Sequence, residues 1–180
     1  EPLGVGELPL HARGERLERP RRPDPQPARS RPQPVGLQLR LAFDEQSVGA
    51  TWRPREGFGA EDGMLAPVAL TALLDEAAFW LGALASGESG MTTDLRVTFL
   101  RSVPFGPAIT VLGERDRVSP RRDDGRYWDT RVVARDPTGV VATGEITFVA
   151  VRGAARRLIS GMLATNPPEI VRRVFPAYAR

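Results

Sequence analysis

Residues 64–84 are apolar almost throughout and carry two adjacent carboxylates, Asp75 and Glu76, near the middle of the stretch. No other charged residue lies between Asp62 and Glu88. A helix that is apolar on all sides is normally buried, so this pattern predicts a core helix. Burying an unpaired carboxylate costs several kcal/mol or shifts its pKa until it is neutral. The acidic pair therefore needs a partner or a function.

The predicted helix begins between Leu65 and Pro67 and runs to about Ala85, ahead of Gly87. Proline is tolerated in the first turn of a helix, where its missing N–H costs nothing, and glycine commonly follows a helix end. The carboxylates and Pro67 inside the stretch argue against a membrane span, although its length would suffice for one.

The segments around this helix alternate between apolar and polar residues, which is typical of half-buried strands. Turn residues separate them, and short turns between successive strands predict an antiparallel sheet. Two strands precede the helix and four follow it, at residues 37–43, 47–53, 92–101, 108–119, 126–135 and 140–151. A short helix is predicted over residues 154–162 and a last turn over 169–175. The fold class is α+β, with a highly curved sheet wrapped around the helix.

The composition narrows the possible chemistry. The chain has no cysteine and no lysine, which excludes disulfides, thiolate metal sites, a cysteine nucleophile, Schiff-base chemistry and a P-loop lysine. Its single histidine, His11, lies in a segment rich in proline and arginine and argues against a Ser-His-Asp triad or a histidine metal site. We therefore expect no metal.

Charge and proline content divide the chain into three parts: a Pro/Arg-rich tail over residues 1–34, a folded domain over 35–151 and a basic extension over 152–180. Residues 36–149 hold twelve arginines against sixteen acidic residues, whereas residues 150–180 hold six against one. Basic ends can attract nucleic acid, but no recognisable nucleic-acid motif supports such binding. No signal-peptide pattern is present, and a cytoplasmic location is expected.

The order strand, loop, helix and four strands, with LLDEA in the helix and DLRVTFLRSVPFG after it, resembles the hotdog-fold thioesterases. The most similar type is that of the phenylacetate pathway, related to 4-hydroxybenzoyl-CoA thioesterase. In that family a characteristic strand motif follows the helix. The residues that match it here are Leu95, Val97, Phe99, Leu100, Arg101, Pro104 and Gly106. The resemblance covers residues 35–151.

The resemblance implies a homodimer or homotetramer in which the active site lies between subunits and a helix carboxylate acts as base or nucleophile on an acyl thioester. That carboxylate falls on Asp75, and Thr71, four residues earlier on the same face, could orient it or a water. Coenzyme A would enter only as part of the substrate, with no other cofactor. Candidate substrate-binding residues are Met64, Leu65, Phe79, Thr92, Thr93, Arg101, Arg121 and Arg122.

One departure from the family pattern concerns the oxyanion donor. The family usually carries His-Gly-Gly at the helix start, and the first glycine falls on Pro67, which has no N–H. Gly63 or the Val68 N–H could substitute, and losing one such donor typically costs about 10²–10³ in rate. Pro67 therefore keeps open a second possibility, a non-catalytic protein that binds an acyl group or CoA or serves in assembly. For Asp75 the structural alternative is an ion pair with an arginine such as Arg96 or Arg101 across a dimer.

Overall fold

The computed structural model describes residues 36–43, 46–121, 123–165 and 167–178. The predicted tail over residues 1–34 lies outside them. The strands are β1 Ala42–Phe43, β2 Ser47–Trp52, β3 Gly90–Phe99, β4 Ile109–Glu114, β5 Ser119–Pro120, β6 Tyr127–Asp136 and β7 Gly139–Ala150. The helices are α1 Pro67–Ser86, α2 Ala155–Thr165 and α3 Pro168–Val174, and a 3₁₀ turn, η1, covers Arg115–Arg117.

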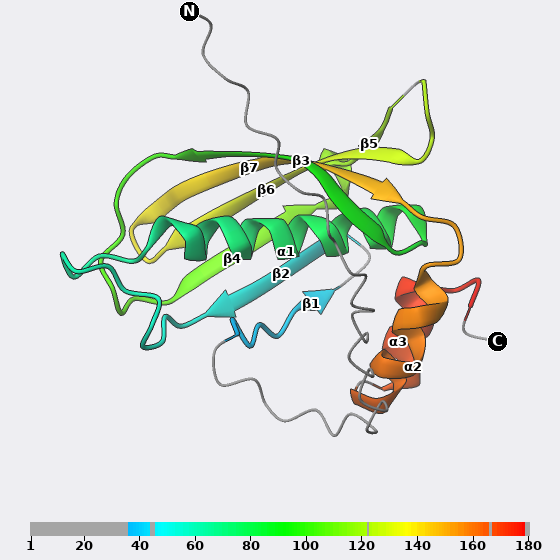
Figure 1. The fold of residues 1–180 in the computed structure, drawn as a ribbon, viewed down its shortest axis with the longest axis horizontal. Helices are drawn as coiled ribbons and strands as arrows, with labels where there is room; N and C mark the ends of the chain where they lie inside the picture. Colours follow the sequence, from blue (N-terminus) through cyan, green and yellow to red (C-terminus); the bar gives the residue numbers. More distant parts are fainter. Residues whose placement is uncertain (1–35, 44–45, 122, 166, 179–180) are drawn as a thin grey trace, which may run out of the picture. The chain divides into compact units, whose positions relative to one another are not determined.

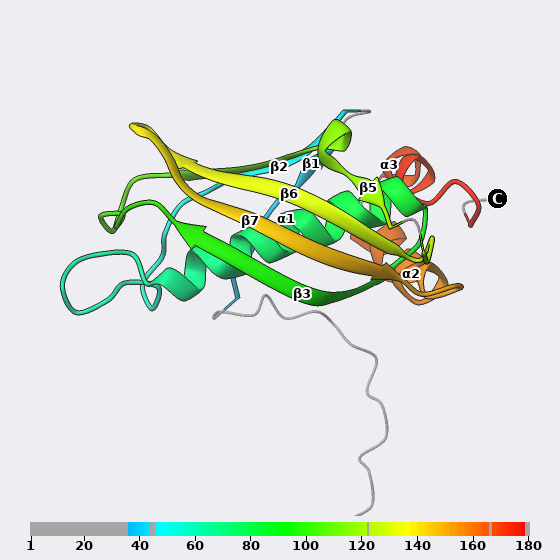
Figure 2. The same ribbon diagram turned by 90° about the horizontal axis from the view of Figure 1, so that it is seen from above.

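The strands form one antiparallel sheet in the order β1-β2-β4-β6-β7-β3, with β5 added beside β6. α1 lies along one face of this sheet and is in contact with five of its strands, from β2 to β3 (Figure 1). Viewed from above, β3 lies at the edge of the sheet, where β7 is its only partner strand among the described residues (Figure 2). The architecture is the predicted hotdog arrangement.

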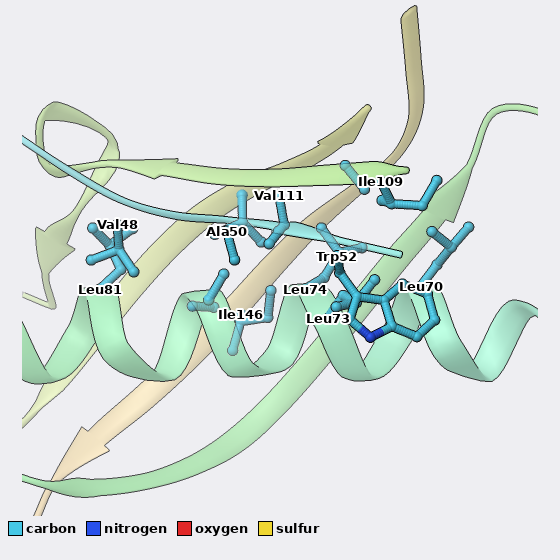
Figure 3. Packing of buried hydrophobic residues seen from close by; sticks show 14 of the residues in the cluster. Val48, Ala50, Trp52, Leu70, Leu73, Leu74, Leu81, Ile109, Val111 and Ile146 are labelled. Carbon is cyan, nitrogen blue, oxygen red and sulfur yellow. The ribbon is translucent and has the colours of Figure 1, made fainter. Parts of the chain in front are cut away.

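The core is built between α1 and the sheet. Leu73, Leu74 and Leu81 of α1 are fully buried, and the close-up in Figure 3 shows leucines of the helix facing apolar side chains of the strands. Alternate residues of β4 and β6 supply the sheet side, including Ile109 and Val111. The sheet covers α1 only in part, since Val68 on its outer side keeps 68% of its surface exposed.

α1 is long and apolar enough to cross a membrane by length and composition. In the structure 56% of its most apolar window is buried inside the protein, which is how the core helix of a globular domain behaves.

The strand expected over residues 37–43 is mostly wrong, because only Ala42–Phe43 pairs with β2. Gln38 adopts φ 48°, a left-handed conformation that interrupts an extended chain. The apolar residues of this segment still pack against the core, and the Trp52 indole donates a 2.8 Å hydrogen bond to the Leu37 carbonyl.

The strand expected over residues 108–119 is interrupted by η1, so that β4 and β5 are separate strands, which pair with different parts of β6. The predicted C-terminal helix is present as α2, which extends three residues beyond its expected end. The segment expected to form a last turn is a helix of seven residues, α3.

Gly82 marks the closest approach of α1 to the sheet. A Cβ placed there would lie 2.5 Å from Cγ of Phe148, whose side chain is fully buried. Gly82→Ala should therefore lower the free energy of unfolding by about 1–3 kcal/mol despite the better helix propensity of alanine.

The matched control is Gly161→Ala in α2, where the added methyl group meets nothing within 4 Å. This change should raise stability by about 0.5–1 kcal/mol. Denaturant unfolding measures both variants, and equal effects of the same sign would contradict the packing described here.

Candidate active site

Asp75 lies in the third turn of α1, on the side of the helix that faces the edge strand β3. The Thr92 hydroxyl donates a 2.7 Å hydrogen bond to Asp75 Oδ1, which fixes the half-buried carboxylate beside the sheet edge. Within the described part of the chain no arginine pairs with Asp75. The structural alternative, an ion pair with Arg96 or Arg101 across a dimer, stays a prediction.

The neighbouring carboxylate, Glu76, points away from β3. It is exposed and accepts a 2.9 Å hydrogen bond from the Trp80 indole one turn further along α1. This contact holds the indole of a half-buried tryptophan, so the two adjacent acids have different surroundings. Of the two, only Asp75 lies at the edge of the sheet.

Thr71 lies one helical turn before Asp75. Its hydroxyl donates a 3.2 Å hydrogen bond to the Pro67 carbonyl, the common arrangement of a helical threonine. The hydroxyl oxygen can still accept a hydrogen bond, but its proton is already donated to the Pro67 carbonyl. The predicted role of Thr71 in orienting Asp75 or a water stays a prediction, and the structure assigns the direct contact with Asp75 to Thr92.

The start of α1 determines which backbone N–H groups remain for a ligand. Ala66 is the N-cap residue and makes no side-chain cap, and Pro67 has no N–H. The N–H of Gly63 donates to Ala60, at 3.1 Å, and is therefore occupied. The N–H groups of the neighbouring residues also have acceptors within the chain, namely those of Met64, Leu65, Ala66 and Ala69.

Val68 is therefore the residue between 63 and 69 whose N–H has no acceptor among the described residues. It lies in the first turn of a helix of 20 residues, where the helix dipole presents partial positive charge. Of the two oxyanion candidates, Gly63 and Val68, the geometry favours Val68.

A cavity of about 300 Å³ opens beside this helix start. Three of the predicted substrate-binding residues line it, namely Met64, Leu65 and Arg101. The other walls come mainly from the loop before α1 and from the chain after β3, with Ala60, Asp62, Pro67, Leu70, Phe99, Leu100, Ser102 and Val103. The lining is largely apolar, which suits an acyl group.

Two of the three arginines predicted to bind substrate are engaged in ion pairs. Arg101 donates to Asp136 at 2.5 Å and to Thr138, and this guanidinium holds the pKa of Asp136 well below its usual range. Arg121 is bound to Asp129, and the contact lowers the pKa of that carboxyl. Both arginines tie strands together across the sheet. Arg122 lies outside the described residues.

Two further residues predicted to bind substrate, Thr93 and Phe79, contact strand β7. Thr93 sits at a β-bulge in β3 and donates to the Thr147 carbonyl at 3.3 Å, away from Asp75. Phe79, one turn beyond Asp75, packs edge-on against Phe148 with ring centroids 5.5 Å apart. Phe79 is half-buried and belongs to the core as well as to the helix face that carries Asp75.

The edge strand exposes apolar side chains next to this site. Met91 keeps 56% of its surface exposed, Leu95 38% and Phe99 46%, and Leu100 follows with 57%. Leu95, Val97 and Phe99 share one face of β3, as the alternation predicted. An exposed edge strand with apolar side chains is a template for pairing with another strand, and a patch of this kind marks an interaction surface.

Sequence reasoning missed two features of the site. It treated Thr92 as a substrate contact, whereas the structure makes it the partner of Asp75 from 17 positions further along the chain. It also missed the contribution of Phe99 and Leu100 to the cavity wall. The available signal was the loss of alternation at these two residues, where an apolar side chain follows directly on another.

Comparison by sequence finds no family model and no curated protein that matches this chain. Comparison by structure finds many matches. A thioesterase from Haemophilus influenzae superposes with a TM-score of 0.55 at 18% identity, covering 64% of this chain and 79% of its own. A thioesterase superfamily protein from Shewanella loihica gives a TM-score of 0.52 at 15% identity, with coverages of 65% and 94%.

A hypothetical thioesterase from Streptococcus pneumoniae, whose structure contains coenzyme A, gives a TM-score of 0.54 at 16% identity and covers 63% of this chain and 88% of its own. At these identities the similarity concerns the fold. It does not confirm the narrower resemblance to the phenylacetate-pathway type. The chain has the hotdog fold of thioesterase-superfamily structures.

Proposed function

We propose that this protein hydrolyses an acyl thioester, with Asp75 as general base or nucleophile, at a site formed by two copies of the chain. The observation that carries the proposal is the Asp75 carboxylate, held by Thr92 at the open edge of a hotdog sheet. Hotdog neighbours titled as thioesterases, one of them containing coenzyme A, support the proposal. Coenzyme A enters as part of the substrate.

The reaction needs a base and a donor for the developing negative charge. In the base mechanism, Asp75 takes a proton from water as the water oxygen bonds to the thioester carbon. The carbon–sulfur bond then breaks, and the proton passes to the leaving thiolate. In the nucleophile mechanism, Asp75 attacks the carbon, and water hydrolyses the resulting anhydride. In both, the carbonyl oxygen gains negative charge that the Val68 N–H stabilises.

One chain does not supply both groups to one carbonyl. Val68 and Asp75 are seven residues apart on the same helix, which separates them by about 10 Å along its axis. A second copy removes this difficulty if the two β3 strands pair antiparallel. Pairing about the middle of the strand brings the Thr92 end of one copy beside the Phe99 end of the other.

Phe99 lines the cavity at the start of α1, so Asp75 of one copy would approach the cavity and the Val68 N–H of its partner. A two-fold axis makes the arrangement reciprocal and gives two equal sites per dimer. The pairing would also cover the exposed apolar side chains of β3 and satisfy its unpaired backbone groups. A tetramer built from two such dimers would keep the same sites.

Pro67 favours a second candidate function, binding of an acyl group or of CoA without hydrolysis. Proline at the first helical position removes one N–H that would otherwise face the cavity. A single remaining donor stabilises the oxyanion less, and the loss of one donor typically costs about 10²–10³ in rate. A protein of this second kind would be stabilised by a thioester without releasing product.

Asp75→Asn should lower the kcat for hydrolysis of a panel of acyl-CoA thioesters by about 10²–10⁴, because the amide can act neither as base nor as nucleophile. Free thiol released from CoA measures the rate. Glu76→Gln is the matched control, since the neighbouring acid points away from β3, and its kcat should stay within about twofold of the wild type. Unchanged turnover in Asp75→Asn would end the hydrolase proposal.

Leu95→Arg should convert the assembly into monomers, since it places a charge in the middle of the paired β3 strands. Sedimentation velocity measures the change, and hydrolysis should be lost with it because each site needs both copies. Leu163→Arg is the matched control, as Leu163 is 47% exposed on α2, outside β3. A wild type that sediments as a monomer and still hydrolyses thioesters would contradict the shared site.

A further inference from the structure

The C-terminal helices α2 and α3 carry an unusual concentration of positive charge. Residues 150–180 contain six arginines and one acidic residue, whereas residues 36–149 contain twelve arginines and sixteen acidic residues. Five of the six lie among the described residues and are exposed: Arg152, Arg156, Arg157, Arg172 and Arg173. We refer to these five as the arginine cluster.

The helices that carry the arginine cluster are anchored to the rest of the domain. The side chains of Val171 and Phe175 are fully buried, and the Phe175 ring lies 6.5 Å from that of Trp80 on α1. The Tyr178 hydroxyl donates a hydrogen bond to Glu88, which follows α1. The cluster is therefore held on a fixed support.

The chain path gathers the arginines at one end of this support. Only residues 166 and 167 separate α2 from α3, the two helices are in contact, and the chain turns back between them (Figure 1). Arg156 and Arg157 lie in the first turn of α2, and Arg172 and Arg173 in the last turn of α3. These four therefore lie at the same end of the helix pair, next to the sheet.

No acidic residue in the described part of the chain pairs with the arginine cluster. One member, Arg156, has its guanidinium 5.8 Å from the centre of the Tyr178 ring. Several arginines of the sheet and its turns do have acidic partners, as Arg101 has Asp136 and Arg121 has Asp129. Cations gathered without counter-ions repel one another and attract an anionic partner.

The arginine cluster lies at the same edge of the sheet as the proposed active site. Ala150, the last residue of β7 before the extension, pairs with Gly90, the first residue of β3. Thr92, the partner of Asp75, is two residues further, about 7 Å along the strand. A macromolecule bound to the arginine cluster would therefore lie close to the proposed active site.

We propose that the arginine cluster docks an acidic carrier protein that presents the thioester on its prosthetic arm. This inference rests on the proposed function. A thioester substrate has an anionic carrier of one of two kinds, a nucleotide or a protein domain. Four arginines on two helices, the longer about 16 Å long, and Arg152 in the turn before them form a surface broader than one nucleotide needs. They suit carboxylates distributed along a protein surface, which steer association.

The test measures binding in the Asp75→Asn background, so that no substrate is consumed. A fluorescently labelled bacterial acyl carrier protein bearing a hexanoyl group is titrated by anisotropy. Arg157→Glu with Arg173→Glu should weaken binding at least about tenfold and flatten its salt dependence. Arg53→Glu with Arg135→Glu is the matched control, because both residues are exposed and lie outside the extension, and it should leave affinity unchanged.

Thermal unfolding of both double variants shows whether they are folded, and hydrolysis of hexanoyl-CoA in the wild-type background gives a second measurement. If Arg157→Glu with Arg173→Glu lowered hydrolysis of hexanoyl-CoA by as large a factor as it lowered binding of the carrier protein, the arginine cluster would be assigned to nucleotide phosphates. That result would overturn the inference. Binding of a short DNA duplex or an anionic vesicle, but not the carrier protein, would also overturn it. Carrier binding by a wild type that hydrolyses neither thioester would leave the docking surface standing and refute the hydrolase.

Discussion

Burial of α1 against one face of the sheet is the interaction on which the rest of the structure depends. Leucines and alanines of the helix face the strands, and the close approach at Gly82 leaves no room for a side chain. The sheet does not enclose the helix completely. A strip remains open along β3, and the Asp75 carboxylate lies in this strip because there it can meet Thr92 and stay partly solvated.

The same open strip explains why the proposed site belongs to two copies. The helix that supplies the carboxylate also supplies, about two turns earlier, the backbone donor that a thioester oxyanion needs. The two groups cannot act together within one chain. The strand β3, which carries the Asp75 partner Thr92, also exposes apolar side chains. Pairing of two β3 strands would cover this surface and bring the complementary groups together.

Where periodicity ran without interruption, the sequence predicted the fold well. The bounds of α1, β3, β6 and β7 agree with the predicted elements within a few residues, because each has an unbroken apolar pattern closed by glycine, proline or a polar turn. The prediction was wrong at residues 37–43, where Gln38 turns the chain with a positive φ, and at residues 108–119, where η1 interrupts the strand. Neither departure changes the apolar pattern, so periodicity could not reveal it.

The candidate site was predicted in part. Asp75 stood out because it is an acid in an apolar helix, and its position beside β3 agrees with that reading. The partners of the charged residues could not be predicted, since Arg101 meets Asp136 and Asp75 meets Thr92 across long stretches of chain. Which backbone N–H groups at the start of α1 are occupied likewise depends on contacts of the preceding loop, such as that between Leu65 and Val103.

The most direct measurement is a crystal structure of the Asp75→Asn variant with an acyl-CoA bound. We expect β3 strands paired across a two-fold axis and a thioester carbonyl between residue 75 of one copy and the Val68 N–H of the other. A thioester bound within a single copy, or far from residue 75, would contradict it.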